Sequence, residues 1–73
     1  MIAIGKHLTA RPCGMSPHEF YTIHSTNSDV VGAVDWNGEW QEYVFVPDRA
    51  FFSAECLQDL VRFVETCNKD QKR

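Results

Sequence analysis

Two strand-like runs that flank the dipeptide Asn37-Gly38 constrain the fold of this chain more than any other feature. Residues 30–36 and 39–46 are rich in Val and aromatic side chains, a composition typical of β-strands. Asn-Gly favours the positive φ angles of a two-residue type I′ turn, so the two runs are expected to pair as an antiparallel hairpin. Pro47 lacks a backbone donor and is expected to end the second strand.

A two-residue turn would fix the register and the two faces of this hairpin. Trp36 would lie opposite Glu39, and Val34 opposite Gln41. The first face is the more aromatic and is expected to face the core; it carries Val30, Val34, Trp36, Tyr43 and Phe45. The second face mixes apolar residues with carboxylates; it carries Val31, Ala33, Asp35, Trp40, Glu42, Val44 and Val46.

A C-terminal amphipathic helix is expected over residues 53–67, followed by a frayed tail over residues 68–73. Ser53 suits the N-cap position, and Phe52 could form a hydrophobic staple with Leu57. The aromatic face of the hairpin is the expected partner of the apolar stripe on this helix. That stripe recurs at helical spacing and consists of Cys56, Leu57, Leu60, Val61, Phe63, Val64 and Cys67.

The whole chain, residues 1–73, is expected to form one α+β domain, since 73 residues suffice for one small core. Residues 20–24 have strand composition, and residues 1–8 could form a short strand. Residues 9–17 contain prolines and a glycine and are expected to be a loop. The predicted fold is therefore a small antiparallel sheet of three to four strands, a β-meander, packed on one C-terminal helix.

Charge and cysteine content favour a cytoplasmic protein that does not bind nucleic acid. The net charge is −3 and the basic residues are scattered, whereas a nucleic-acid-binding domain normally has a basic face. The three cysteines, Cys13, Cys56 and Cys67, are odd in number and show no CxxC spacing, unlike those of a disulfide-rich secreted domain. No long apolar run indicates a membrane span.

Residues that could bind a metal or act as a nucleophile lie mainly in the N-terminal third. His7, Cys13, His18 and His24 are of types that bind zinc, but their spacing matches no compact zinc motif. Cys13 with His18 could form a nucleophile–base pair, yet no glycine-rich oxyanion loop accompanies them. Scattered surface histidines are the simpler interpretation of this segment.

Carboxylates at Asp35, Glu39 and Glu42 surround the tip of the expected hairpin. Paired acids can transfer protons or bind a cation. Charged residues at a turn more often serve to keep the surface soluble. We therefore expect a non-enzymatic protein with no catalytic residue, no metal site and no cofactor.

Exposed aromatic side chains are the feature that most favours a binding role. Trp36 and Trp40 would lie on opposite faces of the hairpin, and a thin two-layer domain cannot easily bury both. Tryptophan is enriched at the energetic centres of protein interfaces. We expect Trp40 to form the centre of an interaction surface that also includes Val31, Val44, Val46, Glu42 and Asp35.

One helix covers only one face of a sheet, so this second face needs another cover. The possible covers are the segment of residues 1–17, a second copy of the chain, or a foreign protein, and a leftover apolar strip favours a symmetric homodimer with Trp40 near its centre. Prolines make the N-terminal segment a poor strand beyond residue 8, so its cover would be partial. The alternative is a small nucleic-acid- or nucleotide-binding module that stacks bases on exposed aromatics, and it would need Lys6, Arg11 and Arg49 on one face.

The middle of the chain carries a longer pattern, which reads Gly32-x-Val34-x-Trp36-x-x-x-Trp40-x-x-Tyr43-x-Phe45-x-Pro47, then Phe52, then Cys56-Leu57-x-Asp59-Leu60-x-x-Phe63. This pattern resembles small uncharacterised proteins encoded by bacteriophages and prophages. The resemblance implies an accessory protein in the cytoplasm of the bacterial host, with a host or phage protein as its partner. It implies no particular activity, although many small phage proteins inhibit host factors or defence systems.

Overall fold

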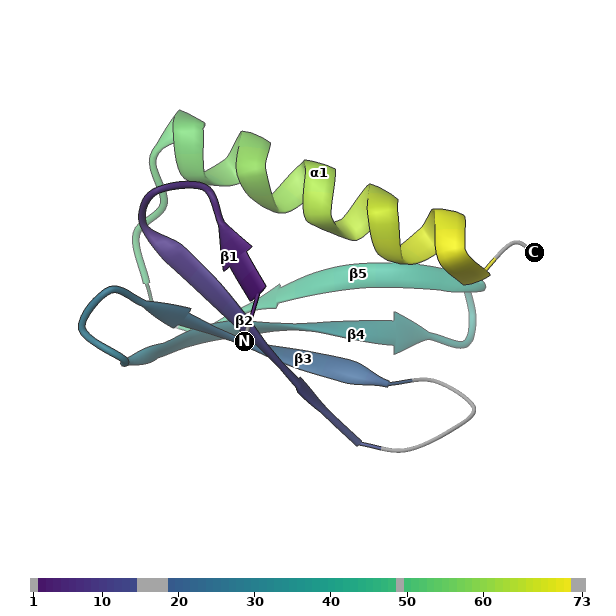
Figure 1. The fold of residues 1–73 in the computed structure, drawn as a ribbon. Coiled ribbons are helices and arrows are strands. Elements are labelled where there is room, and N and C mark those ends of the chain that lie inside the picture. The colour runs from purple at the N-terminus through teal and green to yellow at the C-terminus, as the bar shows by residue number, and fades with distance from the viewer. Residues whose placement is uncertain (1, 15–18, 49, 72–73) are drawn as a thin grey trace.

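Five antiparallel strands follow one another along the chain and precede a single helix (Figure 1). The computed structural model describes residues 2–14, 19–48 and 50–71. Each strand pairs with the next, in the order β1-β2-β3-β4-β5, so the sheet is a meander. The elements are β1 (Ile2–Ile4), β2 (Leu8–Cys13), β3 (Phe20–Ser25), β4 (Val30–Asn37), β5 (Glu42–Pro47) and α1 (Ala54–Gln71). The expected α+β meander is confirmed, with five strands rather than three to four.

The additional strand lies in the N-terminal segment, where one strand and a loop were expected. The chain turns at Gly5 and forms a second strand that continues through Pro12. The prediction of a loop from residue 9 is therefore wrong over residues 9–13, and residues 15–17 lie outside the described residues. Proline is tolerated here because β1 begins at Ile2, opposite Ala10, so the described part of β1 does not extend beside Pro12.

The β4–β5 hairpin pairs as expected, but the predicted turn and register are wrong. Trp36 lies opposite Tyr43 rather than Glu39, a shift of four residues, and a loop over residues 38–41 replaces the two-residue turn. Because the shift is even, Val34, Trp36, Tyr43 and Phe45 remain on the face predicted for them. Trp40 instead falls in the loop.

The side chain of Asn37 explains this longer turn. Its Oδ1 accepts hydrogen bonds from the N–H groups of Glu39 (2.9 Å) and Trp40 (3.0 Å). Its carbonyl accepts from the N–H of Gln41 (2.8 Å), and Gln41 has the left-handed φ of 57°. Asn37 thus caps a short helical turn, as asparagine also does at helix N-termini, instead of entering a type I′ turn.

Helix α1 begins at the predicted cap and extends beyond its predicted end. Ser53 Oγ accepts a hydrogen bond from the Cys56 N–H (3.1 Å), which confirms the N-cap. The helix continues to Gln71, so the frayed tail expected from residue 68 is wrong for residues 68–71. Asn68 anchors this last part to the sheet, because its Oδ1 accepts a hydrogen bond from the Tyr43 N–H (2.6 Å).

The core fills the space between α1 and the sheet face beneath it. The sheet curls so that its first and last strands, β1 and β5, both contact α1 (Figure 1). Aromatic rings meet edge to face in three pairs, Tyr21 with Phe63, Trp36 with Tyr43, and Phe45 with Phe52. The buried side chains are Ile4, Leu8, Ala10, Ile23, Val34, Tyr43, Leu60 and Cys67.

Candidate functional site

The predicted interaction residues lie around β5, although they do not form one continuous face. Asp35 lies opposite Val44, on the outer face of the sheet, which is the face turned away from α1. Val46 lies on the same face and is exposed, whereas Val44 is half-buried. Trp40 lies in the loop before β5, and 65% of its surface is exposed, which confirms that one tryptophan is left outside the core.

The remaining members of the predicted surface are Val31, which is half-buried, and Glu42, which is exposed. The N-terminal segment does not cover the outer face. Residues 2–4 and 8–13 extend the sheet sideways as β1 and β2, so the partial cover predicted for this segment is wrong within the described residues. Helix α1 lies on the other face (Figure 1).

A groove of about 400 Å³ runs between β5 and α1. We call it the β5 groove and define it by its lining residues. Its apolar walls are Tyr43 and Phe45 of β5 with Leu57, Leu60, Val61 and Val64 of α1. Its polar lining consists of Glu42, Glu65 and Asn68. The described lining thus carries carboxylates and an amide but no basic side chain.

Leu57 and Val61 are the helix residues that open this groove. They were expected to pack on the hairpin with Leu60 and Val64, but 47% of Leu57 and 55% of Val61 remain exposed. The apolar arc of the helix, roughly 160° wide, is broader than the strip that a sheet can cover. Leu60 points into the core. Leu57 and Val61, which are four residues apart and lie on one side of Leu60 on the helix surface, are therefore left beside β5.

The backbone of β5 faces the same groove. The Asp48 N–H donates to the Val31 carbonyl (3.0 Å), which makes this a hydrogen-bonded pair in the antiparallel ladder. Hydrogen-bonded and non-hydrogen-bonded pairs alternate, so the backbone groups of Tyr43 and Phe45 point away from β4. Asn68 already binds the Tyr43 N–H. Phe45 therefore presents both its N–H and its C=O toward the open edge.

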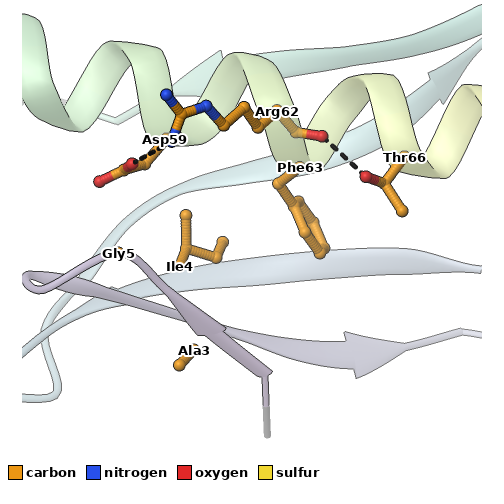
Figure 2. A pocket seen from close by; sticks show the side chains of 7 residues that line it. All are labelled: Ala3, Ile4, Gly5, Asp59, Arg62, Phe63 and Thr66. Atoms are coloured by element: carbon orange, nitrogen blue, oxygen red, sulfur yellow. Dashed lines mark hydrogen bonds and ion pairs between the residues drawn. The ribbon is translucent and has the colours of Figure 1, made fainter.

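A second hollow, of about 310 Å³, lies on the opposite flank of α1, beside β1. Figure 2 shows Ile4 and Phe63 pointing into the space between strand and helix, with Asp59 above Gly5. Asp59 also pairs with Arg62 one helical turn away (3.8 Å), as expected from their spacing. Asp59 is paired with Arg62 and lies against Gly5, whereas Arg62 itself is 77% exposed, so this hollow is a seam between elements.

The outer face carries a short polar chain formed by Cys13, Thr22 and His24. Thr22 Oγ1 lies 3.0 Å from His24 Nε2 and 4.0 Å from Cys13 Sγ. His24 Nδ1 lies 3.3 Å from the Ser28 carbonyl oxygen, so Nδ1 donates to it and Nε2 accepts from Thr22. This arrangement links β2 to β3, but the sulfur contact is too long to be more than weak.

Among the described residues considered for metal binding or catalysis, Cys13 and His24 come near one another through Thr22, but no third ligand joins them. His7 lies in the turn between β1 and β2, and His18 lies outside the described residues. Among the residues that the structure does describe, no three His, Cys, Asp or Glu side chains gather as a metal site would require. The acids expected at the hairpin tip, Asp35, Glu39 and Glu42, are all exposed.

Two titratable side chains, Tyr43 and Cys67, lie in the core, and Tyr21 packs against it. Burial raises the pKa of Tyr21, Tyr43 and Cys67 above their ordinary values. Tyr43 donates its phenolic hydrogen to the Glu19 carbonyl (2.8 Å). A raised pKa keeps the Cys67 thiol protonated at neutral pH, so it is a packing residue rather than a nucleophile.

The basic residues required by the nucleic-acid alternative are spread over the molecule. Lys6 lies in the β1–β2 turn and Arg11 lies within β2, two strands away from the β4–β5 hairpin. Arg49 lies outside the described residues. The structure therefore does not bring a described basic cluster next to Trp40.

Comparisons of the chain with protein-family models, with curated proteins and with solved structures found no match. Within the described part of the chain, no helix is long and apolar enough to cross a membrane. The geometry of the β5 groove is therefore the feature of the molecule that indicates a function. Sequence reasoning missed this groove, and the signal that could have indicated it is the excess width of the apolar stripe on the helix.

Proposed function

We propose that this protein is a non-enzymatic interaction module that binds another protein along β5. The observation that carries the proposal is the gathering of exposed apolar side chains around this one strand. Trp40 precedes it, Val46 lies within it, and Leu57 and Val61 flank it on α1. Large exposed apolar residues that gather at one place mark binding surfaces more often than those scattered singly.

The composition of this surface supports a protein as the partner. Tryptophan and tyrosine anchor protein interfaces, and polar residues form the rim around an apolar centre. The β5 groove has an apolar floor with Glu42 and Glu65 at its border. These carboxylates disfavour nucleic acid, because its phosphates would be repelled.

In keeping with the resemblance to phage-encoded proteins, we place this binding in the bacterial cytoplasm and take a host protein as the partner. Occupation of a host factor's surface would inhibit that factor without any chemistry by this chain. The exposed apolar surface around β5 and the resemblance support the proposal separately, because the evidence from the surface consists of exposure and charge alone.

The proposal is tested by recovering the partner from the natural host with the tagged chain and then measuring the affinity of the purified pair. Trp40→Ala and Val61→Lys should each weaken binding by at least about tenfold, or about 1.4 kcal/mol. Val30→Lys is the matched control, since Val30 is also 50% exposed but does not line the β5 groove. Full binding by both Trp40→Ala and Val61→Lys would refute the proposal.

A further inference from the structure

We infer that the segment bound in the β5 groove is an extended strand of a partner protein in which apolar residues alternate with lysine or arginine, and that it adds to β5 as a sixth strand. This inference rests on the proposed function and names the conformation and chemistry of the partner. It follows from three features of the groove: its open backbone, its apolar floor and its acidic border.

The open backbone selects an extended partner. β5 is the last strand in the sheet order, and the N–H and C=O of Phe45 point away from β4. An antiparallel strand laid here would exchange both hydrogen bonds with Phe45, as in other cases of strand addition to a sheet edge. A helix bound in the same groove would leave these polar groups without a protein partner.

The neighbouring positions limit the added strand to a short contact. Asn68 already accepts from the Tyr43 N–H (2.6 Å), and Pro47 has no N–H to donate. The backbone pairing is therefore centred on Phe45. Such a short ladder supplies orientation, and the side chains must supply most of the affinity.

The apolar floor receives every second side chain of the added strand. A residue that exchanges both hydrogen bonds with Phe45 has its side chain on the same face of the sheet, which is the face beneath α1. That side chain would lie against Leu57 and Val61, which are otherwise about half exposed. A groove of about 400 Å³ has room for an aliphatic side chain of this kind.

The acidic border of the groove indicates which residues lie between the apolar residues of the partner strand. Glu42 and Glu65 border the groove on its strand side and its helix side. The side chains between the apolar ones point to the outer face, where Glu42 lies opposite Asn37, so lysine or arginine at these positions would complement Glu42. Glu65 adds to the negative charge of the groove on its helix side. A second copy of this chain would instead bring two acidic grooves together, and each copy already has a net charge of −3. Charge therefore favours a basic foreign segment over self-pairing.

The experiment uses the full chain and a short synthetic peptide of alternating Lys and Val with blocked ends. The affinity of this peptide for the isotope-labelled chain is measured by NMR titration. A control peptide in which Glu replaces Lys is titrated in the same way. The Lys peptide should bind at least about tenfold more tightly, with the shifts centred on β5 and α1, and added salt should weaken it. Equal binding of the two peptides would overturn the inference.

Peptide N-methylation tests strand addition separately from groove binding. The Val residues that enter the groove are those whose N–H groups face β5, so methylation of the Val amides should abolish binding. Methylation of the Lys amides should leave binding unchanged. Equal effects of the two modifications would refute strand addition.

The variant chains separate this inference from the proposed function. Val61→Lys should lose the Lys peptide, and Val30→Lys should retain it. If the natural partner binds in a Val61-dependent manner but the Lys peptide does not bind, the inference is wrong and the proposed function stands. If the Lys peptide does not bind, and binding of the natural partner depends on neither Val61 nor Trp40, both are wrong.

Discussion

At the scale of single residues, Gly5 shows how a close contact depends on the absence of a side chain. Gly5 has a left-handed φ of 63°, and a Cβ built on it would overlap the Asp59 carboxylate. Gly5→Ala should therefore lower the free energy of unfolding by about 1–3 kcal/mol, measured by urea denaturation. Gly38→Ala is the control, because Gly38 faces open space, and its effect should stay within about 0.5 kcal/mol. Equal effects would contradict this account of the β1–α1 contact.

The hydrogen bond from the Tyr43 N–H to Asn68 Oδ1 (2.6 Å) is a second contact that a single residue supplies. Tyr43 is buried, so Asn68→Ala should leave its N–H without a partner and cost about 1–3 kcal/mol in thermal or urea unfolding. The exposed neighbour provides the control, and Lys69→Ala should change stability by less than about 0.5 kcal/mol. An unchanged stability for Asn68→Ala would show that this bond does not hold the end of α1.

The buried titratable residues predict a loss of stability at alkaline pH. Burial raises the pKa of Tyr21, Tyr43 and Cys67, so the folded chain binds these protons more tightly than the unfolded chain. Their contribution to stability is complete below the ordinary pKa of a thiol, about 8.5, and of a phenol, about 10. It is lost as pH rises from these ordinary values through the raised pKa values of the folded chain. Tyr21→Phe should make the fall above about pH 10 shallower. The free energy of unfolding is measured by urea denaturation at a series of pH values. An equal fall of this free energy with pH in the wild type and in Tyr21→Phe would contradict the prediction.

At the scale of elements, α1 has neighbouring residues with opposite roles. Leu60 is buried in the core, whereas Val61 borders the β5 groove. Leu60→Ala should cost about 2–5 kcal/mol, a large part of the stability of so small a domain. Val61→Ala should cost less than about 0.5 kcal/mol. A cooperative melt of Leu60→Ala near the wild-type temperature would refute the proposed packing of α1.

The β4–β5 hairpin shows which parts of an element the sequence could predict. Strand composition and alternation correctly indicated both strands and placed Val34 and Tyr43 on the core face. The turn was wrong because Asn37 can either enter a type I′ turn or cap a helical turn, and Asn-Gly alone does not distinguish the two. Pro12 misled in a similar way, since whether a strand position is an edge depends on where its neighbour ends.

The candidate site was predicted only in part. The exposure of at least one tryptophan was predicted, because a thin domain cannot easily bury both Trp36 and Trp40, and the exposed one is Trp40. The β5 groove did not follow, because helical periodicity gives the direction of Leu57 and Val61 but not the width of the sheet beneath them. Whether the backbone groups of Phe45 point away from β4 depends on the register of the hairpin. The predicted two-residue turn implied a different register, so this feature was not predicted.

At the scale of the whole molecule, charge bears on self-association. A symmetric dimer through the β5 groove would bring together two grooves that each carry Glu42 and Glu65, so we expect a monomer in sedimentation experiments at low salt. A dimer that Val61→Lys dissociates, and Val30→Lys does not, would contradict this and would make a second copy the occupant of the groove.

The central claim is that β5 is an open edge of the sheet that a partner strand completes. It is tested most directly at the backbone N–H of Phe45. Amide hydrogen exchange of Phe45 is measured by NMR in the free chain and with the alternating Lys-Val peptide bound. Because the Phe45 N–H points away from β4, its exchange should be fast in the free chain and slow strongly on binding, while that of Val46, whose N–H already faces β4, changes much less. If Phe45 exchange is already slow in the free chain, or does not change when the peptide is bound, the claim is wrong.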